Sequence, residues 1–334
     1  MASWAPAPSA WTTCLASEAH AFCWVVTDGK AGMESQCVGL AEALGLTPTI
    51  KRVALRAPWR QLTPYFRIGG LAQFASGSDS LAPPWPDLLI ATGRNSVAAS
   101  LFVKKMSGGR TNTVQLQSPV IAPSHFDLVI VPRHDELKGV NVVSTRGALH
   151  RVTPEILREG AERLAPHVAH LARPYVGVLI GGPNAAYRLG QSDMTVLARR
   201  LASSAREMKA SLLVTPSRRT GEENLRILKS ELAGVPHYLW DGEGENPYFG
   251  LLGLADFLVV TSDSVNMVSE AASTGKPVYV ADLPGGSKKF ERFHAALREE
   301  GVTRPFSGKL APYSYPPLDD MGLVAARVKA LLRA

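Results

Sequence analysis

Short apolar runs alternate with helical patterns along most of the chain, most clearly at residues 257–282 (FLVVTSDSVNMVSEAASTGKPVYVAD). Residues 257–260 predict a buried parallel strand, residues 265–274 a helix that ends at Gly275, and residues 278–281 the next strand. Open parallel sheets bind ligands beyond the carboxyl ends of their strands. The turn after residue 260 is therefore the first place to expect a ligand, and a helix start favours a phosphate there.

The same pattern recurs in both halves of the chain. It predicts further strands at residues 21–27, 49–53, 87–91, 112–116, 126–131, 140–144, 175–180, 211–215 and 237–240. It predicts helices at residues 33–44, 96–104, 153–171, 193–209, 221–232, 290–301 and 318–334, and a short helix from residue 246. Residues 303–309 and 312–317 are expected to be irregular. Strands that alternate with helices indicate an α/β protein with parallel sheets.

Two domains are expected from the length and from the order of these elements. A chain of 334 residues exceeds the roughly 150 residues of a typical domain. The strand, loop and helix order begins again after Pro174, so we expect Rossmann-like domains at residues 21–172 and 173–317. Residues 1–20 are expected to form a loose tail. The amphipathic helix within residues 318–334 either crosses back onto the first domain or caps the second.

Composition narrows the class further. The net charge of +7 suits anionic partners such as nucleotide phosphates, lipid headgroups or nucleic acid. Cys14, Cys23 and Cys37 lack the spacing of a zinc site, which favours a reducing compartment without disulfides. No apolar stretch is long enough to span a membrane, so any membrane contact is expected to be peripheral.

Four residues in the first half are candidate general bases. Asp28 lies in the glycine loop at residues 28–32, and Glu34 follows in the next helix. This loop lacks the spacing of a dinucleotide fingerprint and the ending of a P-loop, so it is either a ligand loop or a plain tight turn. His134 and Asp135 follow the strand at residues 126–131, where bases of α/β enzymes stand, although a surface loop is the alternative.

Polar groups also follow the strands of the second half. Glycine amides, arginines and a helix start are typical ligands of a diphosphate. Glu270, one and a half helical turns after the cap, is either a ligand of ribose hydroxyls or a solvated helix charge. The candidate donor-binding residues are Gly181, Gly182, Asn184, Arg218, Arg219, Thr261, Ser262, Asp263, Ser264, Asn266 and Glu270.

A basic and aromatic segment lies at residues 51–68, within a stretch that has no acidic residue between Glu42 and Asp79. Basic side chains among aromatic ones suit the boundary between anionic headgroups and acyl chains. They also suit single-stranded nucleic acid, or a surface loop whose rings pack on the core. The candidate acceptor or membrane contacts are Arg56, Trp59, Arg60 and Arg67.

Four motifs together resemble the mitochondrial-fission protein family of bacteria and plants: VVTDGKAGMESQCVGLAEALG, VPRHDELKGVNVVSTRGALHRVTPE, IGGPN and TSDSVNMVSEAASTGKPVYV. Its bacterial members are regarded as glycosyltransferases and its plant members as adaptors that recruit fission machinery. Residues 257–282 also resemble the donor segment of GT-B glycosyltransferases such as the lipid-linked N-acetylglucosamine transferase of peptidoglycan synthesis. The resemblance implies a GT-B-like fold of two domains facing a cleft. It places Glu270 at the ribose, and Gly181, Gly182 and residues 262–264 near the diphosphate.

These likenesses imply an enzyme that moves a sugar from a nucleotide-sugar, a UDP-sugar above all, to an envelope lipid or polysaccharide acceptor. No metal is expected, because the chain lacks the pair of aspartates separated by one residue on which metal-dependent GT-A enzymes rely. No cofactor is expected either, since the nucleotide-sugar is a co-substrate. We expect a cytoplasmic protein that docks on the inner face of the plasma membrane and binds no nucleic acid. The alternatives are a non-catalytic, membrane-associated adaptor and a nucleotide-sugar epimerase on the same fold.

Overall fold

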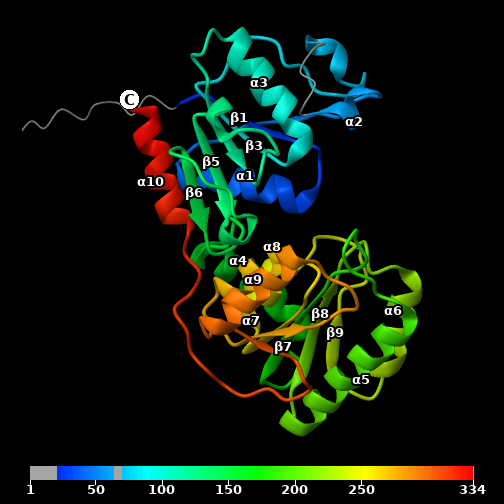
Figure 1. The fold of residues 1–334 in the computed structure, drawn as a ribbon. Coiled ribbons are helices and arrows are strands. Elements are labelled where there is room, and N and C mark those ends of the chain that lie inside the picture. The colour runs from blue at the N-terminus through cyan, green and yellow to red at the C-terminus, as the bar shows by residue number, and fades with distance from the viewer. Residues whose placement is uncertain (1–20, 64–69, 334) are drawn as a thin grey trace, which may run out of the picture.

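The computed structural model describes residues 21–63 and 70–333, which form two six-stranded sheets (Figure 1). The first sheet has the order β2-β1-β3-β4-β5-β6, and the second has the order β12-β11-β10-β7-β8-β9. All neighbouring strands of these sheets are parallel. The α/β architecture of two parallel-sheet units is thereby confirmed.

The first unit contains the elements from β1 to β6 and, in addition, the last helix of the chain, α10 (Met321–Leu332). Its strands are β1 (Cys23–Thr27), β2 (Thr49–Arg52), β3 (Leu88–Thr92), β4 (Asn112–Leu116), β5 (Leu128–Pro132) and β6 (Val142–Thr145). Its other helices are α1 (Ala31–Ala43), α2 (Trp59–Leu62) and α3 (Val97–Met106), with 3-10 turns η1 (Gly70–Gln73), η2 (Arg94–Ser96), η3 (Pro123–His125) and η4 (Arg133–Asp135).

The remaining elements follow β6 along the chain. The strands are β7 (Tyr175–Ile180), β8 (Ser211–Pro216), β9 (His237–Leu239), β10 (Phe257–Thr261), β11 (Val278–Ala281) and β12 (Thr303–Pro305). The helices are α4 (Pro154–Val168), α5 (Gln191–Met208), α6 (Glu222–Leu232), α7 (Tyr248–Leu254), α8 (Val265–Ala272) and α9 (Lys288–Glu299).

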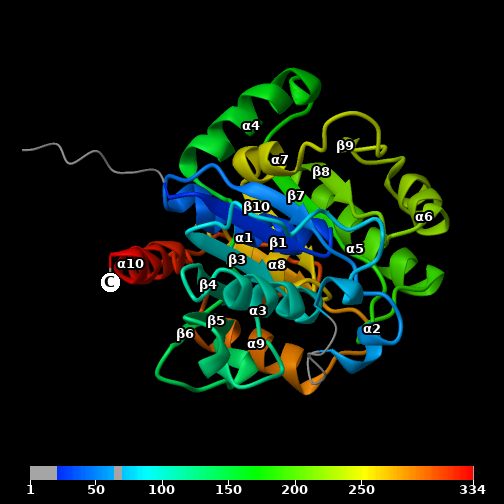
Figure 2. The ribbon, with the colours of Figure 1, turned by 90° about the horizontal axis from the view of Figure 1, so that it is seen from above.

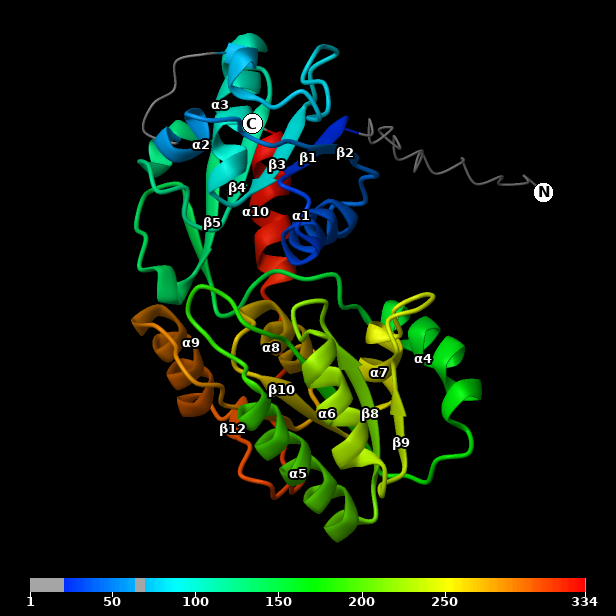
Figure 3. The same cartoon turned by 90° about the vertical axis from the view of Figure 1, so that its right-hand side faces the viewer.

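Helices cover both faces of each sheet, and this explains the apolar strands. Every residue of β1, β3, β5, β7, β8 and β10 is buried. In the first unit α1 and α10 pack on one face and α3 on the other. In the second, α5 and α6 pack on one face, and α4, α7, α8 and α9 on the other (Figure 3). The loops at the carboxyl ends of the strands carry the predicted site residues.

Helix α4 belongs to the second unit, beside α7 (Figure 2). The two helices are so close that a Cβ added at Gly160 would lie 2.6 Å from the amide nitrogen of Gly250. Leu164 and Val168 join the core of the second sheet. A boundary between residues 172 and 173 would instead assign α4 to the first unit. Pro174 marks the entry into β7, but a local stop signal carries no information about which core a preceding helix joins.

Helix α10 crosses back onto the first unit. Val324, Ala325 and Val328 pack in one core cluster with Cys23 and Val25 of β1. The chain therefore passes between the units twice, once before α4 and once before α10 (Figure 3).

One β-strand and one α-helical turn have no counterpart in the sequence pattern. The expectation that residues 303–309 are irregular is wrong for Thr303–Pro305, because these residues form β12 at the edge of the second sheet. The single helical turn Trp59–Leu62 was also not expected. Segments of three or four residues are too short to show a strand or helix period.

Candidate functional site

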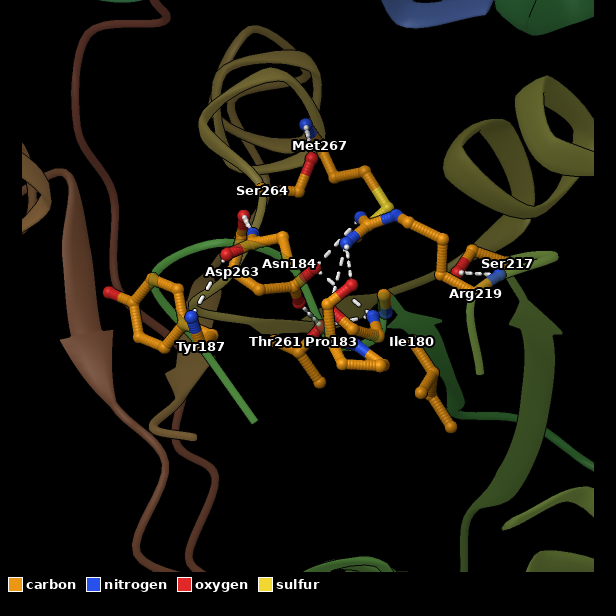
Figure 4. Close-up of polar contacts among 12 residues, drawn as sticks. Ile180, Pro183, Asn184, Tyr187, Ser217, Arg219, Thr261, Asp263, Ser264 and Met267 are labelled. Carbon is orange, nitrogen blue, oxygen red and sulfur yellow. Dashed lines mark hydrogen bonds and ion pairs between the residues drawn. The ribbon is translucent and has the colours of Figure 1, made fainter. Parts of the chain in front are cut away.

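The glycine turn after β7 encloses a carboxylate of the chain itself (Figure 4). The Gly181 amide donates to Thr261 Oγ1 (2.8 Å), and the Gly182 amide donates to Asp263 Oδ2 (3.1 Å). The Thr261 hydroxyl donates in turn to Asp263 Oδ1 (2.7 Å). Both amides, which the sequence suggests as diphosphate donors, are thus bonded to residues at the end of β10.

Arg219 completes this network from the end of β8 (Figure 4). Its guanidinium lies 2.9 Å from Asp263 Oδ2 and donates to the carbonyl oxygens of Gly182 (2.7 Å) and Pro183 (3.2 Å). The Asp263 side chain is fully buried, whereas 44% of the Arg219 side chain is exposed. Arg218 is exposed beside it. Arg219 therefore presents positive charge to solvent at the strand ends, while its Nη2 donates to the Asp263 carboxylate.

The serines of the β10 loop hold that loop in place. Ser262 Oγ accepts a hydrogen bond from the Leu283 amide (3.0 Å), which ties the end of β10 to the chain after β11. Ser264 caps α8, because its Oγ accepts from the Met267 amide (3.3 Å). The positive end of the α8 dipole therefore begins directly after Asp263.

The two predicted donor-site asparagines have structural partners. Asn184 Nδ2 donates to the Asp263 carbonyl (3.1 Å). Asn266 reaches the first unit, where its Nδ2 donates to the Gly32 carbonyl (2.9 Å) and its Oδ1 accepts from Gln36 Nε2 (2.9 Å). The start of α8 therefore touches the glycine loop and first helix of the other unit.

Glu270 is a buried acid bonded to a tyrosine. Its Oε2 accepts a hydrogen bond from the Tyr248 hydroxyl (2.5 Å) at the start of α7. Burial raises the pKa of Glu270 from 4.5 to about 7, although the hydrogen bond opposes this rise. The alternative of a solvated helix charge is therefore wrong. The sequence pattern also missed Tyr248, because no local spacing relates it to a residue two elements further along the chain.

Asp28 and Glu34 lie near the carboxyl end of β1 and have basic partners. Asp28 Oδ2 accepts hydrogen bonds from Lys30 Nζ (2.6 Å) and Asn95 Nδ2 (3.1 Å). Burial alone would raise the pKa of Asp28, but these partners outweigh it and lower the pKa below its usual 3.8. Glu34 binds the Arg52 guanidinium with both oxygens (2.8 and 3.0 Å). Asp28 is therefore ionised at neutral pH.

His134 and Asp135 are part of the contact between the two units. Asp135, whose side chain is 2% exposed, lies 2.5 Å from Lys289 Nζ of α9. His134 packs edge-on against Phe293, and its carbonyl accepts from the Arg292 guanidinium (3.1 Å). Burial lowers the pKa of His134 to about 4, so the ring is uncharged at neutral pH. Asp28 and Glu34 therefore lie together near the end of β1, whereas His134 and Asp135 lie against α9. The sequence pattern missed Lys289, the partner of Asp135.

The basic and aromatic segment is described only in part. The Arg56 guanidinium stacks over the Trp59 ring, 5.2 Å from its centre, and Arg60 is exposed on the same helical turn. Arg94 anchors this turn, since its guanidinium donates to the Thr63 carbonyl (2.6 Å). The predicted contact Arg67, with residues 65, 66 and 68, lies outside the described residues.

A cavity of about 540 Å³ lies between α4, α7 and the loop at residues 241–247. Tyr238, Trp240 and Phe249 line it with aromatic rings. Glu245 of this loop lies 3.6 Å from Arg163 of α4. The cavity opens beside the carboxyl end of β9. The sequence pattern indicated only a flexible acidic loop at residues 241–247 and no cavity.

The described residues contain neither a metal cluster nor a membrane-spanning helix. Within residues 21–63 and 70–333, no group of three or more His, Cys, Asp or Glu residues could hold a metal ion. Among the helices described, none is long and apolar enough to cross a membrane. Cys23 and Cys37 are buried free thiols, and burial raises the pKa of both.

Comparison with known proteins identifies the family. The chain is 31% identical over 391 residues to Mitochondrial fission protein ELM1 of Arabidopsis thaliana, covering 93% of this chain and 91% of that protein. It is 27% identical over 353 residues to Uncharacterized protein RP120 of Rickettsia prowazekii (strain Madrid E), covering 93% and 98%.

The fold also has solved counterparts. The UDP-GlcNAc 2-epimerase of Methanocaldococcus jannaschii, in complex with UDP-GlcNAc and UDP, matches 94% of this chain and 99% of its own, with a TM-score of 0.56 at 10% identity. The architecture is accordingly GT-B-like. Residues 31–332 match the family model "Mitochondrial fission ELM1", and the chain belongs to this family.

Proposed function

We propose that this protein is a glycosyltransferase that binds a UDP-sugar at the carboxyl ends of β7, β8 and β10. The observation that carries the proposal is the meeting of the Arg219 guanidinium with the capped start of α8 around Asp263. A cation and the positive end of a helix are a suitable setting for a diphosphate. The shared fold of an epimerase solved with UDP-GlcNAc and UDP supports a nucleotide-sugar as the ligand.

Glu270 would bind the ribose of this donor. Ribose hydroxyls that donate to the carboxylate would replace the Tyr248 hydroxyl and favour the ionised form of Glu270. Because the pKa of Glu270 is about 7 in the free protein, binding would then release a fraction of a proton at neutral pH. The aromatic cavity beside Trp240 would receive the base.

Asp28 would serve as the general base in the first unit. It is ionised at neutral pH, and the neighbouring Gly32 carbonyl is in contact with α8 through Asn266. The acceptor hydroxyl would give its proton to Asp28 as its oxygen bonds to the anomeric carbon. The bond from that carbon to the phosphate oxygen would break, and its electron pair would leave with UDP. Arg219 and the α8 dipole would stabilise the charge that develops on the diphosphate.

The acceptor is proposed to be an envelope lipid or polysaccharide reached from the cytoplasmic face of the membrane. Exposed Arg56 and Arg60, with Trp59 between them, would contact anionic headgroups.

The donor site is tested by calorimetric titration with UDP, GDP, ADP and CMP. UDP is expected to bind, and Glu270→Gln to weaken binding about tenfold through its contact with the ribose. Glu159→Gln, a change at an exposed position of α4, is the matched control. The donor site is refuted if none of the nucleotides binds at millimolar concentration. An NMR time course of UDP-GlcNAc without acceptor separates the enzymes, because an epimerase would convert the sugar and a transferase would not.

A non-catalytic adaptor at the membrane is the second candidate. The observation that favours it is that the Gly181 and Gly182 amides are already bonded within the protein. This hypothesis predicts that Glu270→Ala and Asp28→Asn proteins keep full biological activity. It also predicts that the protein floats with anionic liposomes and not with neutral ones. A loss of flotation in the Arg56→Gln/Arg60→Gln protein would assign this membrane binding to the basic segment.

A further inference from the structure

Asp263 fills the space that the glycine turn encloses. A Cβ added at Gly181 would clash with both carboxylate oxygens of Asp263, and one added at Gly182 would clash with the backbone of Arg219. Glycine fits at both positions because the Asp263 carboxylate and the Arg219 backbone leave no room for a side chain. Glycines that let backbone approach an anion closely are typical of phosphate loops, and here the anion is part of the chain.

The partners of Asp263 are those of a bound phosphate. The carboxylate accepts from the Gly182 amide (3.1 Å) and the Thr261 hydroxyl (2.7 Å), and pairs with the Arg219 guanidinium (2.9 Å). A backbone amide, a hydroxyl and a guanidinium at the ends of parallel strands make a ready anion cradle.

The cradle is asymmetric in its access to solvent. Asp263 is fully buried, whereas 44% of the Arg219 side chain is exposed. The guanidinium is also held by the carbonyl oxygens of Gly182 and Pro183, so it would stay at the turn without Asp263. An incoming anion can therefore meet Arg219 from the solvent side while Asp263 repels it from within.

We propose that Asp263 is an internal anion that competes with the diphosphate of the donor for Arg219 and the glycine turn. This inference rests on the proposed function for the identity of the ligand. Binding of the donor exchanges Asp263 for phosphate oxygens, so Asp263 sets the affinity of the site for diphosphates.

Two substitutions test this competition with inorganic pyrophosphate and UDP as probes in calorimetry. Asp263→Asn removes the charge at constant shape, and Asp263→Ala also opens the enclosed space. Both are expected to raise affinity for each probe about tenfold or more, because like charges in one partly buried site repel strongly. Adding Arg219→Gln to either variant is expected to abolish the gain.

Asp256→Asn is the matched control, because Asp256 lies just before β10, at the other end of that strand. It accepts from the Tyr175 amide (2.7 Å) and pairs with Arg173 (2.5 Å), so the same charge is removed from a carboxylate with the same kinds of partner, at a side chain that is 33% exposed. Its affinity for both probes is expected to equal that of the wild type. An equal gain in this variant would assign the effect to net charge and overturn the inference.

The outcomes separate this inference from the proposed function. If the wild type binds UDP and folded Asp263 variants gain nothing, the competition is refuted and the donor site stands. If the variants gain pyrophosphate but no protein binds UDP, the internal anion stands and the donor assignment fails. On the wild type itself, the ¹³C resonance of the Asp263 carboxyl is expected to move at saturating pyrophosphate, and an unchanged resonance contradicts the exchange.

Discussion

Replacing Glu270 by glutamine is expected to stabilise the protein at high pH and to have little effect at low pH. The Glu270 carboxyl is buried against Tyr248, and burial raises its pKa from 4.5 to about 7. Between these pH values the folded chain binds a proton that the unfolded chain has lost. The free energy of unfolding of the wild type therefore falls as the pH rises from 4.5 to 7, and the loss is complete above pH 7.

The size of the effect follows from the two pKa values. The interval from 4.5 to about 7, at about 1.36 kcal/mol per pKa unit, corresponds to about 3 kcal/mol above pH 7. Glutamine keeps an acceptor for the Tyr248 hydroxyl and carries no charge. Urea unfolding of both proteins at pH 5, 6, 7 and 8 should show a stability difference that grows over this range in favour of Glu270→Gln.

A difference that stays constant with pH would refute a buried, proton-binding Glu270. Tyr248→Phe provides an opposite test, because it removes the hydroxyl that stabilises the ionised carboxylate. Its destabilisation should therefore be larger at pH 8 than at pH 5. The exposed Glu159→Gln should show neither trend.

Two further substitutions test the packing that positions the site. Gly250→Ala is expected to destabilise the protein by about 2 kcal/mol or more in urea unfolding, because its Cβ would clash with the Gly160 carbonyl. Gly322→Ala, in the first turn of α10 and without a close neighbour, should be neutral or slightly stabilising, and an equal loss there would contradict the clash. Lys289→Met is expected to cost about 2 kcal/mol, because it leaves the buried Asp135 carboxylate without its cation. Adding Asp135→Asn should recover most of that loss, and an additive double variant would contradict the pairing.

The sequence was informative where burial is continuous along a strand. The predicted strands at residues 112–116, 175–180 and 278–281 coincide with β4, β7 and β11. Both faces of these strands are buried under helices, so β7 and β11 are continuous runs of mostly apolar residues whose ends can be seen in the sequence. A polar residue that follows such an apolar run lies at the end of the strand, and the sequence predicted these positions correctly. A short edge strand such as β12 has too few residues to show an apolar run.

The partners of those polar residues could not be predicted. Glu270 meets Tyr248 across two helices, and Asp135 meets Lys289 across the two units. Such contacts depend on how the elements pack and not on any local period. A carboxylate after a strand therefore looks the same in the sequence whether it faces solvent, a ligand or, as Asp135 does, a lysine of the other unit.

The main predicted ligand groups in the second unit are already bonded within the protein, and this constrains how a donor could bind. Asp263 is bonded to Arg219 and the glycine turn, and Glu270 to Tyr248. A nucleoside diphosphate would have to replace both sets of bonds, so its binding is an exchange in which little new hydrogen bonding is gained.

A fragment that carries only the phosphates or only the ribose breaks one set and leaves the other intact. Because α8 carries Glu270 and begins directly after Asp263, movement of this helix would couple the two exchanges, and UDP would then bind more tightly than its separate parts predict. An adaptor has no need of this coupling, since it keeps both sets of bonds in place.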